Sequence, residues 1–450
     1  MTSAAPASAP PAAPGAGGMP ISRVVRLWAP LAASWVLMAV ELPMLTAVVA
    51  RLPDPTVHLA AYGSLVFPVS LVVEGPIIML LAASTALCTH ERAYRQVHRF
   101  MMWASAALTA VHAAIAFTPL YEVVAVDIMG APEEILEPGR LGLQIMTPWT
   151  WSIAYRRFHQ GVMIRFEHGR EVTLGTVVRL LVNASALGVG FAAGWQGIVV
   201  GATAIAAGVV AEAVYIGWRV RPILRERVFP AEPEGEPLTV RSFLHFYVPL
   251  ALTPVITLMI QPIGAAAMNR MPVALDSLAA WPAVHGLLFI TRSVGMAHNE
   301  VVVTLVGKPG SVAALRRFQK GLMAGTMGLL ALLAATPLAE LWFARLSGLP
   351  PALVALATVA VALAIPMPGY AVLQSWYQGV LVKGRRTRPI TEAVLLYFGL
   401  SGALLAAGIA LQGPPGIHWA LGSFVVAGVC QTAWLWWRSR EVVAAYSSST

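Results

Sequence analysis

The stretch FHQGVMIRFEHGREV, residues 158–172, has a counterpart in WYQGVLVKGRRTRPI, residues 376–390. Each reads as an aromatic residue, one further residue, Gln-Gly-Val, two apolar residues and a basic turn that contains Gly-Arg. Gln160 and Gln378 lie 218 positions apart in a chain of 450 residues. An unusual phrase that recurs at this distance indicates an internal repeat of about half the chain.

The same offset aligns other landmarks. At an offset of 219, PLAASWV (30–36) falls on PLALTPV (249–255), and Arg51-Leu-Pro53 falls on Arg270-Met-Pro272. At an offset of 218, Gly130-x-Pro132 falls on Gly348-x-Pro350. A nearly constant offset at separated sites predicts two homologous halves.

The composition predicts a membrane protein. Hydrophobic residues make up 58% of the chain and charged residues only 11%, whereas a soluble domain has about 25% charged residues. So apolar a chain must be embedded largely in lipid. The two cysteines lie in apolar segments, so they predict neither a disulfide framework nor a thiolate metal site.

Twelve stretches are long and apolar enough to predict spanning helices, which need about 20 residues each. They are 27–50, 57–88, 100–120, 140–163, 172–194, 196–218, 243–268, 275–305, 318–342, 351–380, 389–411 and 417–437.

The basic residues predict the orientation. If the N-terminus is cytoplasmic, all but five of the 30 Lys and Arg residues fall in segments on the cytoplasmic side. Four lie on the other side and one lies within a helix: Arg51, Arg140, Arg270, Arg345 and, in the helix, Arg292. This bias predicts a multi-pass protein of the plasma (inner) membrane with both termini cytoplasmic. The net charge of +9 is spread over short loops, which argues against a nucleic-acid partner.

Because six is an even number, both halves enter the membrane from the same side. We therefore expect an all-α fold of two parallel six-helix lobes related by a pseudo-two-fold axis along the membrane normal. The expected parts are a disordered tail (1–22), an N-lobe (23–218), a charged, Pro-rich cytoplasmic linker (219–242), a C-lobe (243–437) and a cytoplasmic tail (438–450).

Two stretches carry Gly-x-Pro just before the fourth and tenth helices: MGAPEEILEPGRLGLQI and SGLPPALVALATVAVAL. With the six-plus-six arrangement, they resemble the multidrug/oligosaccharidyl-lipid/polysaccharide (MOP) exporter superfamily, whose best-known branch is the MATE antiporters. FYVPLALTPVITLMIQPIGAAAMNR (246–270) and LAAYGSLVFPVSLVVEGP (59–76) resemble the progressive ankylosis family. That resemblance implies export of pyrophosphate, citrate or a nucleotide phosphate.

Charged residues inside predicted helices are the candidate functional residues, because such residues are costly in lipid. Glu74 lies beside Gly75-Pro76, where we expect the helix to be broken, and Arg292 lies at a nearly equivalent place in the other half. Arg292 is expected to bind an anionic group of the substrate, since a guanidinium fork suits phosphate or carboxylate. The expected polar helpers are Gln261, His285 and Asn299. The alternative is a buried Glu74–Arg292 ion pair that locks the lobes together.

Glu41 and Glu74 are the candidate coupling residues for a proton or Na⁺. The MATE resemblance implies an acidic residue in the first helix, and Glu41 occupies that helix. The alternative for Glu41 is a carboxyl group hydrogen-bonded to a neighbouring helix.

The Gln-Gly phrase has two interpretations. In the first, the role is structural, and Gly161 and Gly379 permit close packing of helices. In the second, a hinge at the cytoplasmic gate is formed by Gln160, Gly161, Gln378 and Gly379.

These features predict an alternating-access secondary exporter of a small organic or phosphorylated anion. The alternatives are a MATE-type multidrug or cation antiporter, a flippase for lipid-linked saccharides and a membrane scaffold without transport. The sequence contains no Walker loop, HExxH or nucleophile elbow, so we expect no enzyme, cofactor or metal site.

Overall fold

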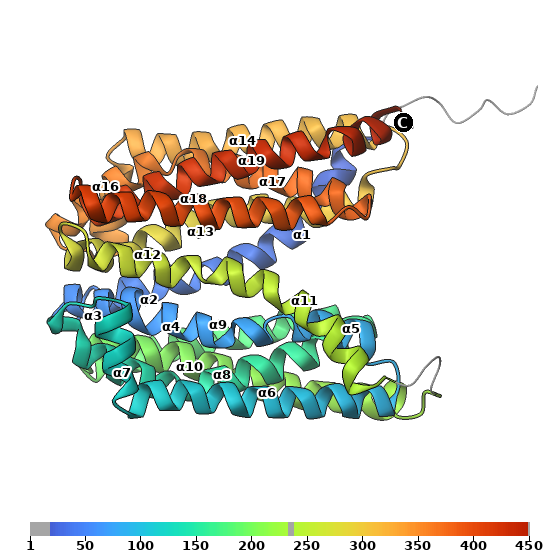
Figure 1. The fold of residues 1–450 in the computed structure, drawn as a ribbon, viewed down its shortest axis with the longest axis horizontal. Coiled ribbons are helices and arrows are strands. Elements are labelled where there is room, and N and C mark those ends of the chain that lie inside the picture. The colour runs from blue at the N-terminus through green and yellow to red at the C-terminus, as the bar shows by residue number, and fades with distance from the viewer. Residues whose placement is uncertain (1–18, 233–237, 449–450) are drawn as a thin grey trace, which may run out of the picture.

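The computed structural model describes residues 19–232 and 238–448, which form helices and no strands (Figure 1). Ten helices in these ranges are long and apolar enough to cross a membrane, or eleven if the bent pair α16 (Pro351–Leu363) and α17 (Pro366–Lys383) is one span. The remaining predicted span, 140–163, lies in α8 (Leu136–Arg165), whose 30 residues include several charged ones. The predicted all-helical membrane fold is confirmed.

Each half of the sequence supplies one lobe of helices, apart from α1 (Ile21–Ala39) and α11 (Val240–Leu258), which pack against the lobe of the other half (Figure 1). The first half comprises α1, α2 (Glu41–Val49), α3 (Pro55–Ala61), η1 (Tyr62–Val66), α4 (Phe67–Glu74), η2 (Gly75–Ile77), α5 (Leu80–Leu87), α6 (Glu91–Phe117), α7 (Leu120–Glu122), η3 (Val123–Ile128), η4 (Glu133–Ile135), α8, α9 (Gly169–Ala192), α10 (Gly197–Ile223) and η5 (Leu224–Val228). The second half comprises α11, α12 (Ile260–Asn269), α13 (Ala274–Leu305), α14 (Ser311–Ala335), α15 (Leu338–Glu340), η6 (Leu341–Leu346), α16, α17, α18 (Arg388–Leu411) and α19 (Gly416–Ser448).

The repeat is visible in the positions where helices break. α1 ends at Ala39, four residues before Pro43, and α11 ends at Leu258, four residues before Pro262. A proline has no N–H to bond the carbonyl four residues back, and its ring crowds that carbonyl. The first span of each lobe is therefore kinked at equivalent residues.

On the N-terminal side of these kinks, the first helix of each half packs on the lobe of the other half. The indole N–H of Trp28 on α1 donates to the carbonyl of Val294 on α13 at 2.8 Å. The hydroxyl of Tyr247 on α11 donates to the carbonyl of Pro76 in η2 at 2.7 Å. In Figure 1, α1 and α11 accordingly run obliquely between the lobes.

The predicted domain boundaries do not all coincide with helix ends. α1 begins at Ile21, while residues 1–18 of the predicted tail lie outside the described ranges. α10 and η5 continue to Val228, so the first residues of the predicted linker (219–242) are helical, and residues 233–237 also lie outside the described ranges. α19 extends through most of the predicted C-terminal tail.

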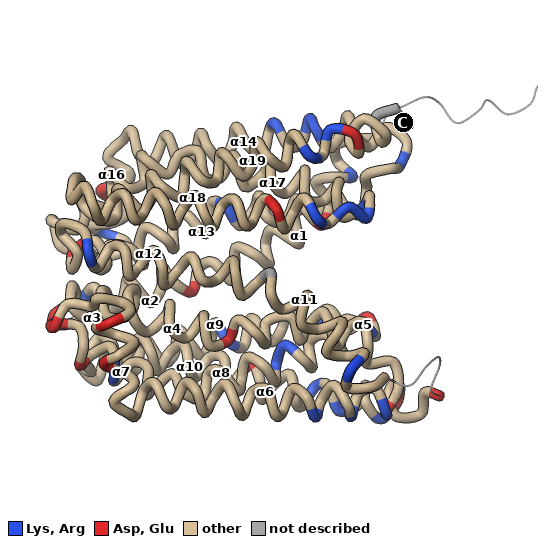
Figure 2. The backbone as a smooth tube through the Cα atoms, viewed as in Figure 1, with Lys and Arg blue, Asp and Glu red and all other residues tan. Residues whose placement is uncertain are grey.

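The basic residues gather at the end of the bundle that carries the C-terminus (Figure 2). Three arginines depart from this distribution. The sequence places them at the cytoplasmic turns, but in the structure they lie inside the first lobe. Arg156 and Arg157 belong to α8 and Arg179 belongs to α9, and the side chains of Arg156 and Arg179 are buried.

Candidate functional site

A buried polar network centred on Glu212 of α10 lies inside the first lobe. Glu212 is fully buried. The amide of Gln160 donates to Glu212 Oε1 at 2.9 Å. Arg156 and Arg179 place guanidinium nitrogens 3.4 Å and 3.6 Å from Glu212 Oε2. α8, α9 and α10 are thus joined by charges that lipid and water do not reach.

Glu41, a predicted coupling residue, belongs to the same network. It is the first residue of α2, directly after the kink at Val40. Arg179 lies 3.4 Å from Glu41 Oε2, and the amide of Asn183 donates to Glu41 Oε1. Arg179 therefore bridges Glu41 and Glu212 and connects the kink of the first span to α10.

A sequence signal for this network exists in the helical spacing. Arg156 and Gln160 are four residues apart on α8, and Arg179 and Asn183 are four residues apart on α9. Such pairs lie on one face of a helix. The sequence interpretation counted these arginines among the cytoplasmic segments and assigned no functional role to Asn183 or Glu212, because it considered only the position of each residue along the chain.

Glu74, the other predicted coupling residue, lies where its helix is interrupted. α4 ends at Glu74, and Gly75–Ile77 form one turn of 3-10 helix, as the Gly-Pro pair predicts. The side chain is buried, and Glu74 makes no hydrogen bond or ion pair with any residue in the described ranges. Arg156, Arg157 and Arg179 all act on it electrostatically.

Arg292 lies on α13 in the second lobe. Within the described chain it forms no ion pair, and its buried Nε has no hydrogen-bond partner. The groups that it influences electrostatically are His285, Tyr370 and Tyr397. The alternative Glu74–Arg292 ion pair is absent among these residues, because the charged neighbours of Glu74 are arginines of its own lobe.

The predicted polar helpers divide into two groups. Gln261 on α12 and His285 on α13 are in contact, with Nε2 atoms 3.2 Å apart. Asn299 lies further along α13, and its amide donates to the carbonyl of Ser375 on α17 at 3.2 Å. Gln261 and His285 thus belong with Arg292, whereas Asn299 joins two helices of the second lobe.

The two glycines of the Gln-Gly phrase lie within continuous helices at close crossings. A Cβ atom on Gly161 would lie 2.0 Å from Ser84 Oγ and 2.2 Å from the carbonyl oxygen of Leu81. A Cβ atom on Gly379 would lie 2.8 Å from Val302 Cβ. Both crossings match the packing interpretation of the phrase. A hinge at Gln160, Gly161, Gln378 and Gly379 stays a prediction.

Two arginines join the lobes at the end of the bundle away from the C-terminus. Arg51 donates to the carbonyls of Arg345 and Leu346 in η6, at 2.5 Å and 3.1 Å. Arg270, its equivalent in the repeat, donates to the carbonyls of Ile128 and Met129, at 2.9 Å and 3.0 Å. Each arginine caps a helix that belongs to the other half of the sequence. We call the pair the arginine clasp.

The clasp explains the recurrent Gly-x-Pro. Gly130 and Gly348 have φ angles of +64° and +72°, which glycine adopts at little cost. A Cβ atom on Gly130 would lie 2.8 Å from the guanidinium carbon of Arg270, and one on Gly348 would lie 2.8 Å from a guanidinium nitrogen of Arg51. Both glycines therefore leave room for an arginine of the other half.

Known structures share this architecture. The chain matches an inward-facing multidrug resistance MATE family transporter of the MOP superfamily with a TM-score of 0.70 and 12% identity, over 95% of this chain and 99% of the other. It matches the lipid II flippase MurJ in an inward closed conformation at 0.67 and 11%, over 95% and 89%. A mutant of the Vibrio cholerae MATE transporter VcmN matches at 0.67 and 16%, over 94% and 98%.

The chain therefore has the fold of the MOP superfamily, shared by MATE transporters and MurJ, as the sequence resemblance implied. No protein-family model and no curated protein sequence matches the chain. The finer resemblance to the progressive ankylosis family is not confirmed by these structures.

Proposed function

We propose that the protein is an alternating-access transporter that exports a small organic or phosphorylated anion. The observation that carries this proposal is the charge inside the two lobes. In the first lobe, the buried Glu74 and Glu212 and the partly buried Glu41 face three arginines, Arg156, Arg157 and Arg179. In the second lobe, Arg292 has no such partner among the described residues. An anionic substrate would supply the missing charge.

The surroundings of Arg292 suit an anion with several oxygens. His285, Gln261, Tyr370 and Tyr397 provide neutral polar groups that can donate hydrogen bonds. Glu300 is the nearest acidic residue along α13, and eight residues of helix separate it from Arg292 by about 12 Å. A pyrophosphate- or citrate-like anion fits this donor set better than an organic cation does.

The contacts between the lobes support alternating access. The arginine clasp joins the lobes at one end, away from the C-terminus. α1 and α11 cross between the lobes and are kinked at Pro43 and Pro262. A transporter of this kind would open the clasped end when these contacts break and the first spans straighten.

Transport by the purified protein tests the proposal. Proteoliposomes are loaded with pyrophosphate, with citrate or, as the alternative cargo, with a cationic dye, and efflux is compared with protein-free vesicles. We expect efflux of at least one anion and none of the dye. Efflux of the dye alone would favour a cation antiporter and overturn the proposal.

The coupling role of Glu41 predicts a change in pH dependence. Glu41→Gln keeps the shape of the side chain and the contact with Asn183 but removes the charge that faces Arg179. We expect the variant to transport the anion at a rate that no longer responds to a pH gradient across the vesicle membrane. Glu74→Gln is the companion variant, because Glu74 can take up a proton without breaking any contact among the described residues. An unchanged dependence of transport on pH in both variants would show that neither carboxyl group couples transport to protons, and would favour facilitated, uncoupled export.

The proposed orientation places both termini in the cytoplasm, on the side where the basic residues gather. Single cysteines are introduced in a background without Cys88 and Cys430. Cysteines at Pro55 and Pro132 should react with an impermeant maleimide added to intact cells, whereas cysteines at His90 and Gly169 should react only after lysis. The reverse labelling pattern would show that the protein has the opposite orientation in the membrane.

A further inference from the structure

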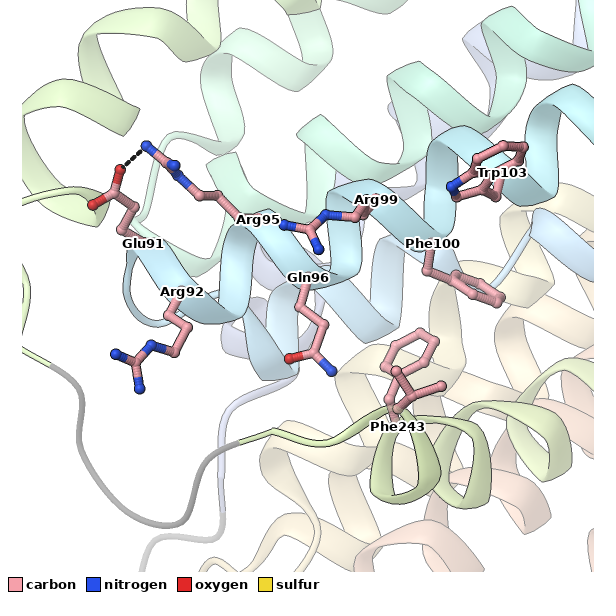
Figure 3. Close-up of a pocket in the computed structure, with 9 residues that line it drawn as sticks. Glu91, Arg92, Arg95, Gln96, Arg99, Phe100, Trp103 and Phe243 are labelled. Carbon is pink, nitrogen blue, oxygen red and sulfur yellow. Dashed lines mark hydrogen bonds and ion pairs between the residues drawn. The ribbon is translucent and has the colours of Figure 1, made fainter.

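A groove lies between α6 and α11, at the end of the bundle where the basic residues gather (Figure 3). Its volume is about 640 Å³. α6 contributes most of the lining, and Val240 and Phe243 at the start of α11 complete it. The groove therefore has one wall from each half of the sequence.

The basic part of the groove comes from the first turns of α6. Arg92, Arg95 and Arg99 are spaced by three and four residues, which places them along one side of the helix. Arg95 is paired with Glu91 at 2.5 Å. Arg92 and Arg99 form no ion pair or hydrogen bond with any other described residue. Two guanidinium groups in one groove thus have no anionic partner among the residues that the structure describes.

The apolar part begins directly after these arginines. The ring centroids of Phe100 on α6 and Phe243 on α11 lie 4.7 Å apart. Figure 3 shows the two rings side by side in the groove. Trp103 follows on the next turn of α6, with 75% of its surface exposed. On a spanning helix, a change from arginine to exposed tryptophan is typical of the boundary between lipid headgroups and acyl chains.

We propose that this groove binds an anionic phospholipid of the leaflet on the side of the termini. Arg92 and Arg99 bind the phosphate oxygens, and the first carbons of an acyl chain lie against Phe100 and Trp103, with the buried Phe243 packed behind Phe100. A small soluble anion would use the arginines but leave the aromatic wall uncovered, which favours the lipid. The proposal does not depend on the transported substrate.

A second arginine-rich groove, of about 520 Å³, lies between α18 and α19 and differs in its charge balance. There Arg386 is paired with Glu441 at 2.9 Å, and Arg438 is paired with Glu392 at 3.0 Å. Arg388 is also paired with Glu392, so three of the five arginines in this groove have a carboxylate of the chain itself as partner. Arg386 therefore provides a matched control on the same end of the protein.

Native mass spectrometry of the full-length protein, titrated in detergent with phosphatidylglycerol or phosphatidylcholine, tests the proposal. We expect tight binding of phosphatidylglycerol only. The double variant Arg92→Gln, Arg99→Gln should weaken it about thirty-fold, since each arginine near an anionic surface strengthens binding about five-fold and the two factors multiply. Arg386→Gln should leave it unchanged. Equal binding of both lipids, or an equal loss in Arg386→Gln, would overturn the proposal.

A further experiment distinguishes binding of the lipid from binding of a free phosphate ester. Trp103→Ala should weaken phosphatidylglycerol binding several-fold, and glycerol 3-phosphate at the same concentration should not compete with the lipid. Full competition by glycerol 3-phosphate, together with an unaffected Trp103→Ala variant, would show that the groove is a site for soluble phosphate instead.

Discussion

Arg292→Gln should reduce anion efflux from proteoliposomes by at least about 100-fold while the protein still folds and inserts. A hydrogen bond between a charged group and its ligand contributes roughly 1.5–3 kcal/mol, and a guanidinium that forks to two oxygens makes two such bonds. Because Arg292 has no ion-pair partner in the described chain, its replacement strands no carboxylate and should not lower stability.

Arg292→Lys should restore only part of the transport, since an ammonium group cannot fork to two oxygens. The matched control is Arg140→Gln, which removes an arginine paired with Glu122 at 3.0 Å near the surface, and efflux should stay near that of the unchanged protein. If Arg292→Gln transports the anion normally, the proposed substrate site is wrong. If it fails to fold, Arg292 has a structural role.

Glu212→Gln should produce the largest loss of stability of any single charge change. Glu212 is the acidic partner of both Arg156 and Arg179 and is fully buried. Removing one member of a buried ion pair costs about 3–5 kcal/mol, because the remaining charge is left without compensation. We expect the apparent midpoint of thermal unfolding in detergent to fall by roughly 5–10 °C.

Glu171→Gln is the control for Glu212→Gln. Glu171 accepts two hydrogen bonds from Arg219 at 2.7 Å and 2.8 Å, but Arg219 is 39% exposed. An exposed pair contributes about 1 kcal/mol or less, so the midpoint should change little. Adding Arg156→Gln to Glu212→Gln removes one charge of each sign and should recover part of the stability. Equal shifts in the two single variants would show that burial of the network is not what stabilises it.

The fold could be predicted from the sequence because its main determinants are local. The spacing of apolar stretches follows from the thickness of the bilayer. The positions of Pro43 and Pro262, which set the kinks, recur at the offset of the repeat. The break after Glu74 follows from Gly75-Pro76 in the same way.

The candidate site could be predicted only in part, because its contacts depend on how helices rotate against one another. Glu41, Glu74 and Arg292 were recognisable as charges within apolar stretches. Their partners were not: Arg179 lies near a helix start in the sequence, yet tertiary packing turns its side chain inward to Glu41 and Glu212. The position of a residue along the chain indicates how deep it lies in the membrane. Which side chains pair also depends on how α8, α9 and α10 are rotated about their own axes.

The arginine clasp also bears on how the chain is synthesised. Arg270 follows Met129, whose carbonyl it caps, by 141 residues, and Arg345 follows Arg51 by 294 residues. A ribosome adds about 5–20 residues per second, so the carbonyls at the end of η3 are synthesised roughly 7–28 s before Arg270. During that interval these carbonyls depend on water or lipid headgroups. Neither half can complete its own helix ends, and a lobe produced alone would keep the uncapped carbonyls that the intact chain removes.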